Sequence, residues 1–466
     1  MIQFFNTLTG RKEVFHPIVP GEVKIYTCGP TVYDYPHIGN FRAYVFEDLL
    51  KRFLQLSGFR ITHVMNITDV DDKTIKGARA QGASLSQYTA KYIQAFFDDL
   101  GLLQVSPAGA YPRATEHIPE MVKIISKLLE TGYAYIKDGS VYFSIAKFPG
   151  YGKLSKIRID ELQSTARIES DEYEKESAQD FALWKAKKEG EPYWDTDLGP
   201  GRPGWHIECS AMSAKYLGER FDIHCGGVDN IFPHHENEIA QSEAYFGHPF
   251  VNVWLHCHHL IVNGEKMSKS KGNYFTLRGL TEKRVDPLDI RFLLLSTHYR
   301  KVLNFTFEAL DQAKTSIQRI KDFLYELGNR SFPAGNSPLV TKMISATKKK
   351  FIEGLGDDLN ISVALTALFE LIKEANILIK QNKLFGGDAE ALSKLVYTLD
   401  RVLAVLPPKQ EAALPEELLA KIQRRETARK EKDYASADRI RQELLQAGVV
   451  LEDTKEGVRW KVIKTK

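Results

Sequence analysis

Residues 22–40, EVKIYTCGPTVYDYPHIGN, join a short apolar run to a turn that carries a thiol, two glycines, two prolines and an imidazole. The run EVKIY (22–26) predicts a strand, and FRAYVFEDLLKRFLQLSG (41–58) has the apolar spacing of a helix. A strand that passes through a glycine-containing turn onto a helix presents backbone N–H groups and the positive end of the helix dipole. This stretch therefore predicts phosphate binding at the end of a strand.

The same alternation of strand and helix continues along the chain. RITHVMNIT (60–68) predicts a second strand, followed by the acidic loop DVDDK (69–73) and a helix. After residue 200 come a helix at 206–218, a strand at 221–227, a helix that begins near residue 233 and one alternating strand at 251–262. Strands separated by helices predict an α/β fold with a parallel sheet that binds ligands at its strand ends.

Other segments predict additional parts. Residues 111–200 interrupt the pattern with a hairpin at 132–145 and a charged, Gly/Pro-rich region, which indicates an insertion. Helical periodicity to residue 406 predicts a bundle, and one charged helix at 416–448 precedes a β-like tail. The expected domains are 1–110 with 201–315 (parallel sheet), 111–200 (insertion), 316–406 (α-helical bundle) and 407–466 (small mixed α/β C-terminal domain).

Composition excludes several classes of protein. The chain has 466 residues, 43% hydrophobic and 26% charged, and no apolar run approaches the roughly 18 residues of a membrane helix. Its first residues lack the pattern of a secretory signal. The four cysteines form no CxxC pair, so we expect free thiols or metal ligands and a cytoplasmic location. A net charge of +3 neither requires nor excludes nucleic acid.

A set of metal-ligand residue types is spread along the chain. His234 and Glu238, in PHHENEIAQS, stand four apart near a predicted helix start and share a face. With Cys209 and Cys28 they form a Cys/Cys/His/Glu set suited to tetrahedral zinc. Spacing alone favours core cysteines and an exposed His/Glu pair, and it leaves other ligands open, namely His235, Cys225 and HCHH (256–259). A metalloprotease is excluded because Ile239 stands where HExxH needs its second His.

Two further motifs point to phosphate. His37, in PHIGN, follows the first strand, and EKMSKSKGN (265–273) places Lys266, Lys269 and Lys271 among small polar residues. Loop lysines are usually only solvated. Three of them on one loop can nevertheless bind a polyphosphate and stabilise an in-line transition state.

HIGN combined with KMSKS resembles the nucleotide-binding pair of class I aminoacyl-tRNA synthetases. YTCGPTVYDYPHIGNFR, NITDVDDK, PGWHIECSAM, DIHCGGVDNIFPHHENEIAQSEA and KDYASADRIRQELLQAGVVLEDTKEGVRW resemble cysteinyl-tRNA synthetases, in order and over nearly the whole chain. The class-wide HIGH pattern has a His where this chain has Asn40, and the cysteine-specific family uses either residue.

The resemblance implies a Rossmann-like catalytic domain and assigns site residues. It implies one Zn²⁺ per chain, and ATP with Mg²⁺ as substrate. It places the zinc ligands on Cys28, Cys209, His234 and Glu238. It places ATP binding on His37, Gly39, Asn40, Asp229, Lys266, Met267, Ser268, Lys269 and Ser270, with His37, Lys266 and Lys269 acting in catalysis.

The resemblance also implies an amino-acid pocket next to the ATP site. Serine differs from cysteine by one atom, and an apolar pocket separates such pairs by only about 1–3 kcal/mol. A zinc–thiolate contact would select the softer sulfur. The implied pocket residues are Gly29, Thr68, Asp69, Trp205 and His224. A closed, purely structural zinc site is the alternative.

The implied activity is that of a cysteine–tRNA ligase, which forms cysteinyl-adenylate from L-cysteine and ATP and transfers the cysteine to the 3′ end of tRNA(Cys). The expected chain is a monomer without membrane contacts. Basic residues at 424–441 and Trp460 are candidates for RNA binding. Two rival functions are a tRNA-independent cysteine ligase, which the intact tail LEDTKEGVRW disfavours, and a non-catalytic zinc-containing RNA-binding protein, which the phosphate motifs disfavour.

Overall fold

The computed structural model describes residues 1–157, 180–407, 416–431, 433–454 and 457–462. Two compact units can be distinguished, Met1–Val405 and Leu406–Lys466, and each is described by itself. No helix in these described ranges is both long and apolar enough to cross a membrane.

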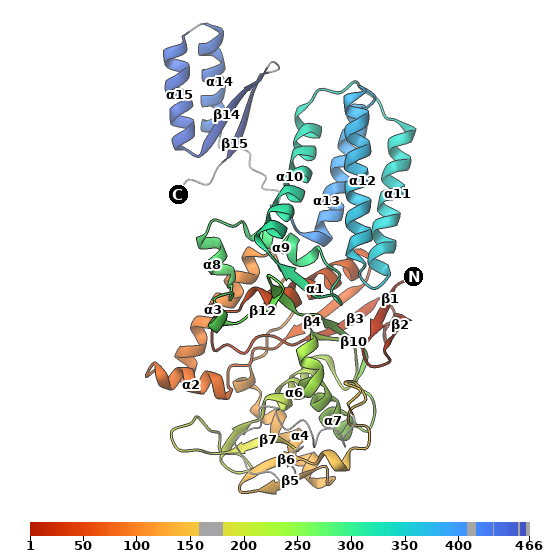
Figure 1. Ribbon diagram of the computed structural model, residues 1–466, viewed down its shortest axis with the longest axis vertical. Coiled ribbons are helices and arrows are strands. Elements are labelled where there is room, and N and C mark those ends of the chain that lie inside the picture. The colour runs from red at the N-terminus through yellow and green to blue at the C-terminus, as the bar shows by residue number, and fades with distance from the viewer. Residues whose placement is uncertain (158–179, 408–415, 432, 455–456, 463–466) are drawn as a thin grey trace. The chain divides into compact units, whose positions relative to one another are not determined.

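A four-stranded parallel sheet with the order β10-β9-β3-β4 forms the centre of the first unit (Figure 1). Its strands are β3 (Glu22–Thr27), β4 (Arg60–Met65), β9 (Phe221–Gly227) and β10 (Val251–Cys257). The crossover helices are α1 (Ile38–Leu56), α6 (Trp205–Leu217) and α7 (Glu236–Phe246). This arrangement confirms the predicted α/β fold, and it brings the turns after β3 and β9 to the same edge of the sheet.

The first crossover helix starts where the phosphate motif stands. His37 is the N-cap of α1: its Nδ1 accepts a hydrogen bond from the Asn40 N–H at 3.2 Å, and the Asn40 Oδ1 accepts one from the His37 N–H at 3.0 Å. Such a reciprocal pair satisfies two N–H groups that a helix start leaves unpaired. Asn40 therefore fixes the turn that carries His37.

The predicted strand at 251–262 is wrong in its extent. β10 ends at Cys257, and β11 (Leu260–Val262) belongs to a separate small sheet with the order β12-β11-β13. The break places β12 (Glu265–Lys266), and with it the KMSKS segment, beyond the edge of the main sheet. The third strand of the small sheet, β13 (Leu303–Phe305), runs parallel to β11.

The remaining elements of the sheet region surround this core. An N-terminal hairpin is formed by β1 (Gln3–Asn6) and β2 (Arg11–Val14). An antiparallel sheet of β5 (Ala134–Lys137), β6 (Ser140–Phe143), β7 (Phe181–Ala186) and β8 (Gly201–Pro203) confirms the predicted hairpin at 132–145 and extends past residue 200, where the insertion was expected to end. The other helices are α2 (Asp72–Ala80), α3 (Leu85–Leu102), α4 (Ile118–Glu130), α8 (Leu277–Glu282) and α9 (Pro287–Leu295).

Four long helices form the predicted bundle: α10 (Phe307–Asn329), α11 (Pro338–Gly356), α12 (Ile361–Lys380) and α13 (Gly386–Leu403). A fully buried arginine of α9, Arg291, joins the bundle to the sheet region. Arg291 donates to Asp48 of α1 at 2.6 Å and to the carbonyl of Leu403, at the end of α13, at 2.7 Å. Neighbouring Arg291 and Arg52 outweigh burial and lower the pKa of Asp48. The guanidinium therefore fixes the bundle against the helix that begins at His37.

The second unit corrects one prediction. Residues 416–448 form two helices, α14 (Glu416–Lys430) and α15 (Tyr434–Gln446), and not a single helix. Asp433 caps α15 by accepting a hydrogen bond from the Ser436 N–H at 3.1 Å. A hairpin of β14 (Val449–Thr454) and β15 (Gly457–Val462) follows, as the β-like tail predicted.

Candidate active site

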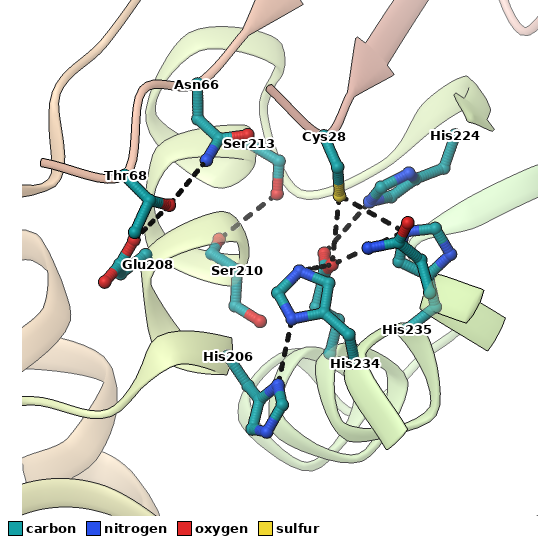
Figure 2. Close-up of polar contacts among 12 residues, drawn as sticks. Cys28, Asn66, Thr68, His206, Glu208, Ser210, Ser213, His224, His234 and His235 are labelled. Atoms are coloured by element: carbon teal, nitrogen blue, oxygen red, sulfur yellow. Dashed lines mark hydrogen bonds and ion pairs between the residues drawn. The ribbon is translucent and has the colours of Figure 1, made fainter. Parts of the chain in front are cut away.

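Four potential metal ligands from three segments meet beside the end of β3 (Figure 2). Cys28 follows β3, His234 and His235 lie in a short π-helical segment at Ile231–His235, and Glu238 lies in the first turn of α7. Their ligand atoms lie within 4.8 Å of one another. His234 Nε2 lies 3.0 Å from Glu238 Oε1, and the Cys28 sulfur lies 3.9 Å from the same oxygen. The cluster is thus compact enough to surround one ion.

Cys209 joins the cluster from α6. Its thiol is buried and lies close enough to Cys28 and His234 for both to shift its pKa. Burial alone would raise the pKa of Cys209, but the neighbouring Cys28 and His234 lower it to about 6. The structure therefore brings together all four residues that the resemblance assigned to zinc.

The charges of this cluster fit a divalent cation. Burial would lower the pKa of His234, but Cys209 and Glu238 raise it to about 10. Burial would raise the pKa of Glu238, but His224 and His234 lower it to about 2. A buried imidazolium thus stands between a thiolate and a carboxylate. A metal ion can replace the proton of such a set, since metal ligands bind in their deprotonated forms.

His235, one of the ligands that spacing left open, also approaches this cluster. Its Nε2 lies 3.2 Å from the Cys28 sulfur, while its Nδ1 hydrogen-bonds with His256 at 2.8 Å. His256 in turn hydrogen-bonds with Thr7 at 2.7 Å. The contacts of both its ring nitrogens hold His235 in place, and its Nε2 belongs to the group of ligand atoms that lie within 4.8 Å of one another.

The two phosphate motifs lie side by side, as expected of one site. Ile38 N–H donates to the carbonyl of Phe275 at 2.9 Å, and the rings of His37 and Tyr274 meet edge to face at 5.4 Å between centroids. A Cβ on Gly39 would lie 2.9 Å from the His37 ring and 3.3 Å from the Met267 methyl group. Glycine at position 39 therefore allows this close approach.

The other residues assigned to ATP are exposed around this junction. Asp229 lies in the 3-10 turn Val228–Asn230 that follows β9. Burial lowers the pKa of His37, and the charge of Asp229 opposes that shift, which places the two side chains in the same region. Lys266 and Ser270 are exposed, and the hydroxyl groups of Ser268 and Ser270 hydrogen-bond at 2.8 Å.

Lys269 is paired with a residue that sequence reasoning did not single out. It forms an ion pair with Asp34, from the turn that precedes HIGN, and its ammonium lies 5.1 Å from the centre of the Tyr274 ring. If Lys269 binds phosphate, as the resemblance implies, its ammonium would have to exchange Asp34 for phosphate oxygens. Asp34 would then compete with the nucleotide for this lysine.

Asp34→Asn is expected to lower the KM for ATP by roughly two- to fivefold, because an exposed ion pair contributes about 0.2–1 kcal/mol. Steady-state ATP–pyrophosphate exchange measures this change. Glu265→Gln, which removes the partner of Lys271, is the matched control and is expected to leave the KM unchanged. A raised KM for ATP in Asp34→Asn would contradict competition.

The residues assigned to the amino-acid pocket differ in their exposure and in their hydrogen-bond partners. Trp205 is 40% exposed, and its ring stacks on His234 at 4.3 Å between centroids. Gly29 donates its N–H to Asn66 at 3.0 Å, and Thr68 donates to Glu208 at 2.8 Å. Figure 2 shows Thr68 with its hydrogen-bond partners Asn66 and Glu208.

The side chains of the other two assigned pocket residues are hydrogen-bonded to neighbouring protein groups. Both carboxylate oxygens of Asp69 accept hydrogen bonds from Thr115, at 3.0 and 2.7 Å. His224 is fully buried, stacks on Trp254 and hydrogen-bonds with Glu238 at 2.9 Å. Asp69 and His224 therefore orient neighbouring residues. Sequence reasoning missed His206, which hydrogen-bonds with His234 at 2.9 Å, although it lies in the motif PGWHIECSAM.

Three family models match consecutive parts of the chain. The family model described as "tRNA synthetases class I (C) catalytic domain" matches residues 14–315. The DALR domain model matches residues 350–407, and the model described as "Cysteinyl-tRNA ligase anticodon binding domain" matches residues 411–460.

Full-length relatives are similar over almost their whole length. A cysteine–tRNA ligase of Solibacter usitatus is 49% identical over 462 residues, which cover 99% of each chain. One from Chlamydia trachomatis serovar A is 50% identical over 472 residues, with 98% of each chain covered.

Two solved structures share the fold. Mycobacterium tuberculosis methionyl-tRNA synthetase in complex with methionyl-adenylate has a TM-score of 0.59 at 15% identity, covering 82% of this chain and 90% of its own. A leucyl enzyme of Agrobacterium radiobacter K84, in a ternary complex titled LeuRS-tRNA-LeuAMS, has a TM-score of 0.60 at 11% identity, covering 84% and 85%. At these identities the likeness concerns the fold alone.

Proposed function

The chain belongs to the cysteine–tRNA ligase family, and from this premise we propose that its buried Cys/His/Glu cluster holds one zinc ion that selects cysteine over serine. The protein is an ATP-dependent ligase that activates L-cysteine and joins it to tRNA. The observation that carries the proposal is the donor set: Cys28, His234 and Glu238 have ligand atoms within 4.8 Å of one another, and Cys209 lies close enough to Cys28 and His234 for both to shift its pKa.

Selection between cysteine and serine needs more than size. A methylene-sized difference in an apolar pocket is worth only about 1–3 kcal/mol. Bound zinc supplies a soft Lewis acid that prefers a thiolate to a hard alcohol. Cys28 and Cys209 would hold the ion together with His234 and Glu238, while Trp205, stacked on His234, would form the aromatic wall of the pocket.

The alternative of a purely structural zinc requires a closed site. Three of the four proposed ligands are buried, whereas Cys28 is half-buried and lies on the side of Gly29 and Thr68. This partial exposure leaves the site approachable from the amino-acid pocket and favours a role in substrate binding.

Activation itself needs no protein nucleophile. A carboxylate oxygen of cysteine attacks the α-phosphorus of ATP, the new P–O bond forms, and the bond to pyrophosphate breaks. We assign His37, Lys266 and Lys269 to the phosphate oxygens, where they stabilise the charge that develops on the phosphates. Gly39 and Asn40 shape the turn, Met267, Ser268 and Ser270 complete the loop, and Asp229 accepts from the ribose hydroxyl groups. Mg²⁺ enters with ATP and neutralises the leaving pyrophosphate.

We assign recognition of the anticodon to the C-terminal domain, residues 407–466, which almost coincides with the second unit (Leu406–Lys466). The conserved-domain match at 411–460 supports this role and disfavours a ligase that passes cysteine to a small amine. Arg439 and Arg441 of α15 are exposed, whereas Arg425, also a candidate for RNA contact, is buried and pairs with Glu426. Trp460 lies in β15, and its side chain is outside the described residues.

The other parts of the assignment are proposals of the same kind. We divide the first unit into the catalytic domain (1–110 and 201–315), the insertion (111–200) and the bundle (316–406). We also propose that the protein is a monomer in the cytoplasm; its four cysteines form no disulfide, which fits a reducing compartment.

An ATP–pyrophosphate exchange assay with cysteine or serine, with and without a chelator, tests the proposal. We expect exchange with cysteine, at least roughly 100-fold less with serine, and loss of the cysteine-dependent signal once zinc is removed. Re-adding zinc is expected to restore it. Undiminished selectivity in the metal-free protein would contradict the role of zinc, and absence of exchange would contradict the activation step.

A further inference from the structure

A buried carboxyl group stands next to the amino-acid pocket without a role in the function described so far. Glu208 precedes Cys209 on α6 and is 0% exposed. Its Oε2 accepts a hydrogen bond from the Thr68 hydroxyl at 2.8 Å, while its Oε1 has no hydrogen-bond partner among the described residues. A buried oxygen of this kind normally has a partner, since leaving it without one costs about 1–3 kcal/mol.

Glu208 is tied to the substrate side of the site by a chain of hydrogen bonds. Thr68 Oγ1 accepts from the Asn66 amide at 3.2 Å, and Asn66 Oδ1 accepts from the Gly29 N–H at 3.0 Å. A Cβ on Gly29 would lie 1.7 Å from the Asn66 carbonyl oxygen, so only glycine allows the two backbones to come so close. Figure 2 shows the dashed lines that join Asn66, Thr68 and Glu208. The chain holds the carboxyl group in a fixed position relative to the turn after β3.

The Glu208 carboxyl group has no ion-pair partner: within the ranges that the structure describes, no lysine, arginine or histidine forms an ion pair with it. Its buried Oε1 is therefore available to accept a hydrogen bond from a bound ligand. Free cysteine carries one cationic group, its α-ammonium.

We propose that Glu208 is a substrate-binding residue whose Oε1 accepts a hydrogen bond from the α-ammonium of cysteine. The inference rests on the proposed cysteine pocket beside Cys28. It explains why a fully buried oxygen is left without a protein partner and why Asn66 and Thr68 fix its position. It also gives the pocket a second determinant of specificity: the sulfur is recognised at the metal cluster, and the free amine is recognised at Glu208.

The test compares two thiols that differ only in the amine, cysteine and 3-mercaptopropionate, by calorimetric titration of the full-length, zinc-loaded protein without ATP. Glu208→Gln is expected to weaken cysteine binding by roughly 10- to 100-fold, because hydrogen bonds between charged groups contribute more than neutral ones. Binding of 3-mercaptopropionate is expected to change less than about twofold. An equal effect on both thiols, or no effect on either, would overturn the proposal.

Two further variants control for misfolding of Glu208→Gln and for the general effect of changing a buried carboxyl group. Glu208→Asp keeps the charge but shortens the side chain, and it is expected to weaken cysteine binding selectively even if Glu208→Gln does not fold. Glu47→Gln changes another fully buried carboxyl group, on α1, and is expected to leave the ratio of the two affinities unchanged. Zinc content, measured for each variant, separates loss of the amine contact from loss of the metal.

The proposed pocket and the proposed amine contact can fail separately. If wild-type protein binds cysteine no better when loaded with zinc than without it, the pocket beside Cys28 is wrong. If zinc-loaded wild-type protein binds cysteine and Glu208→Gln does so equally well, only the amine contact is wrong.

Discussion

Cys209→Ala is expected to purify without zinc and to lower cysteine-dependent ATP–pyrophosphate exchange by roughly 100- to 1,000-fold. Removing even an outer partner of a metal ligand typically costs 10- to 100-fold in metal affinity, and a direct ligand contributes more. The surroundings of Cys209 also favour the thiolate form that binds a metal, since Cys28 and His234 lower the pKa of Cys209 to about 6 against the effect of burial. Metal analysis and the exchange assay measure the two losses.

ATP binding is expected to survive this substitution, because the nucleotide motifs stand on the turn of α1 and on the loop after β12. Cys225→Ala is the matched control. Cys225 is equally buried, but it lies on β9 near Glu47 and Cys257, and the pKa of its thiol is raised by burial and by those two groups. We expect this control to retain zinc. Full zinc content in Cys209→Ala would show that Cys209 is no ligand.

Lys269→Ala is expected to lower the rate constant of cysteine activation by roughly 100- to 1,000-fold, with the KM for cysteine changed by less than about threefold. The removal of one group that stabilises transition-state charge has effects of this size. The exposure of Lys269 and its pairing with Asp34 leave the ammonium free to reach a bound triphosphate when that pair opens. Single-turnover kinetics of adenylate formation separate the two parameters.

Lys271→Ala provides the comparison for this loop. Lys271 is the neighbouring exposed lysine, and it pairs with Glu265 on the same loop and not with the turn before HIGN. We expect its substitution to change activation by less than about fivefold. Equal losses in rate and in cysteine affinity for Lys269→Ala would mean that the lysine binds the ground state as well as the transition state.

Local patterns predicted those parts of the structure that local physics determines. The strand at 22–27 and the helix after His37 follow from apolar spacing and from a turn that caps the helix. Asn40 departs from the class-wide HIGH pattern, and the reciprocal hydrogen bonds with His37 explain what an asparagine does at this position.

Predictions failed where an interruption left little trace in hydrophobicity. The alternation of residues 251–262 continues through His258 and His259, where the strand ends and the chain enters a different sheet. Likewise, charge periodicity continues through the boundary between α14 and α15, and the single local signal was Asp433, a residue type that favours helix N-caps.

The metal cluster could not be found from spacing, because its members come from separate segments. Cys28 and Glu238 are 210 positions apart, and the sheet topology alone brings their side chains to 3.9 Å. The contacts of His206 and His235 are equally non-local. The resemblance identified the four ligands. The structure shows the neighbouring contacts and charges that would favour metal binding by them.

The most direct test of the central claim is zinc K-edge X-ray absorption of the zinc-loaded protein before and after addition of cysteine. With Cys28 and Cys209 as ligands, two sulfur atoms are expected at about 2.3 Å from zinc in the free protein. Cysteine is expected to add a third sulfur at that distance, and serine to leave the spectrum unchanged. Two sulfur neighbours in the presence of saturating cysteine would contradict selection of the substrate through its thiol.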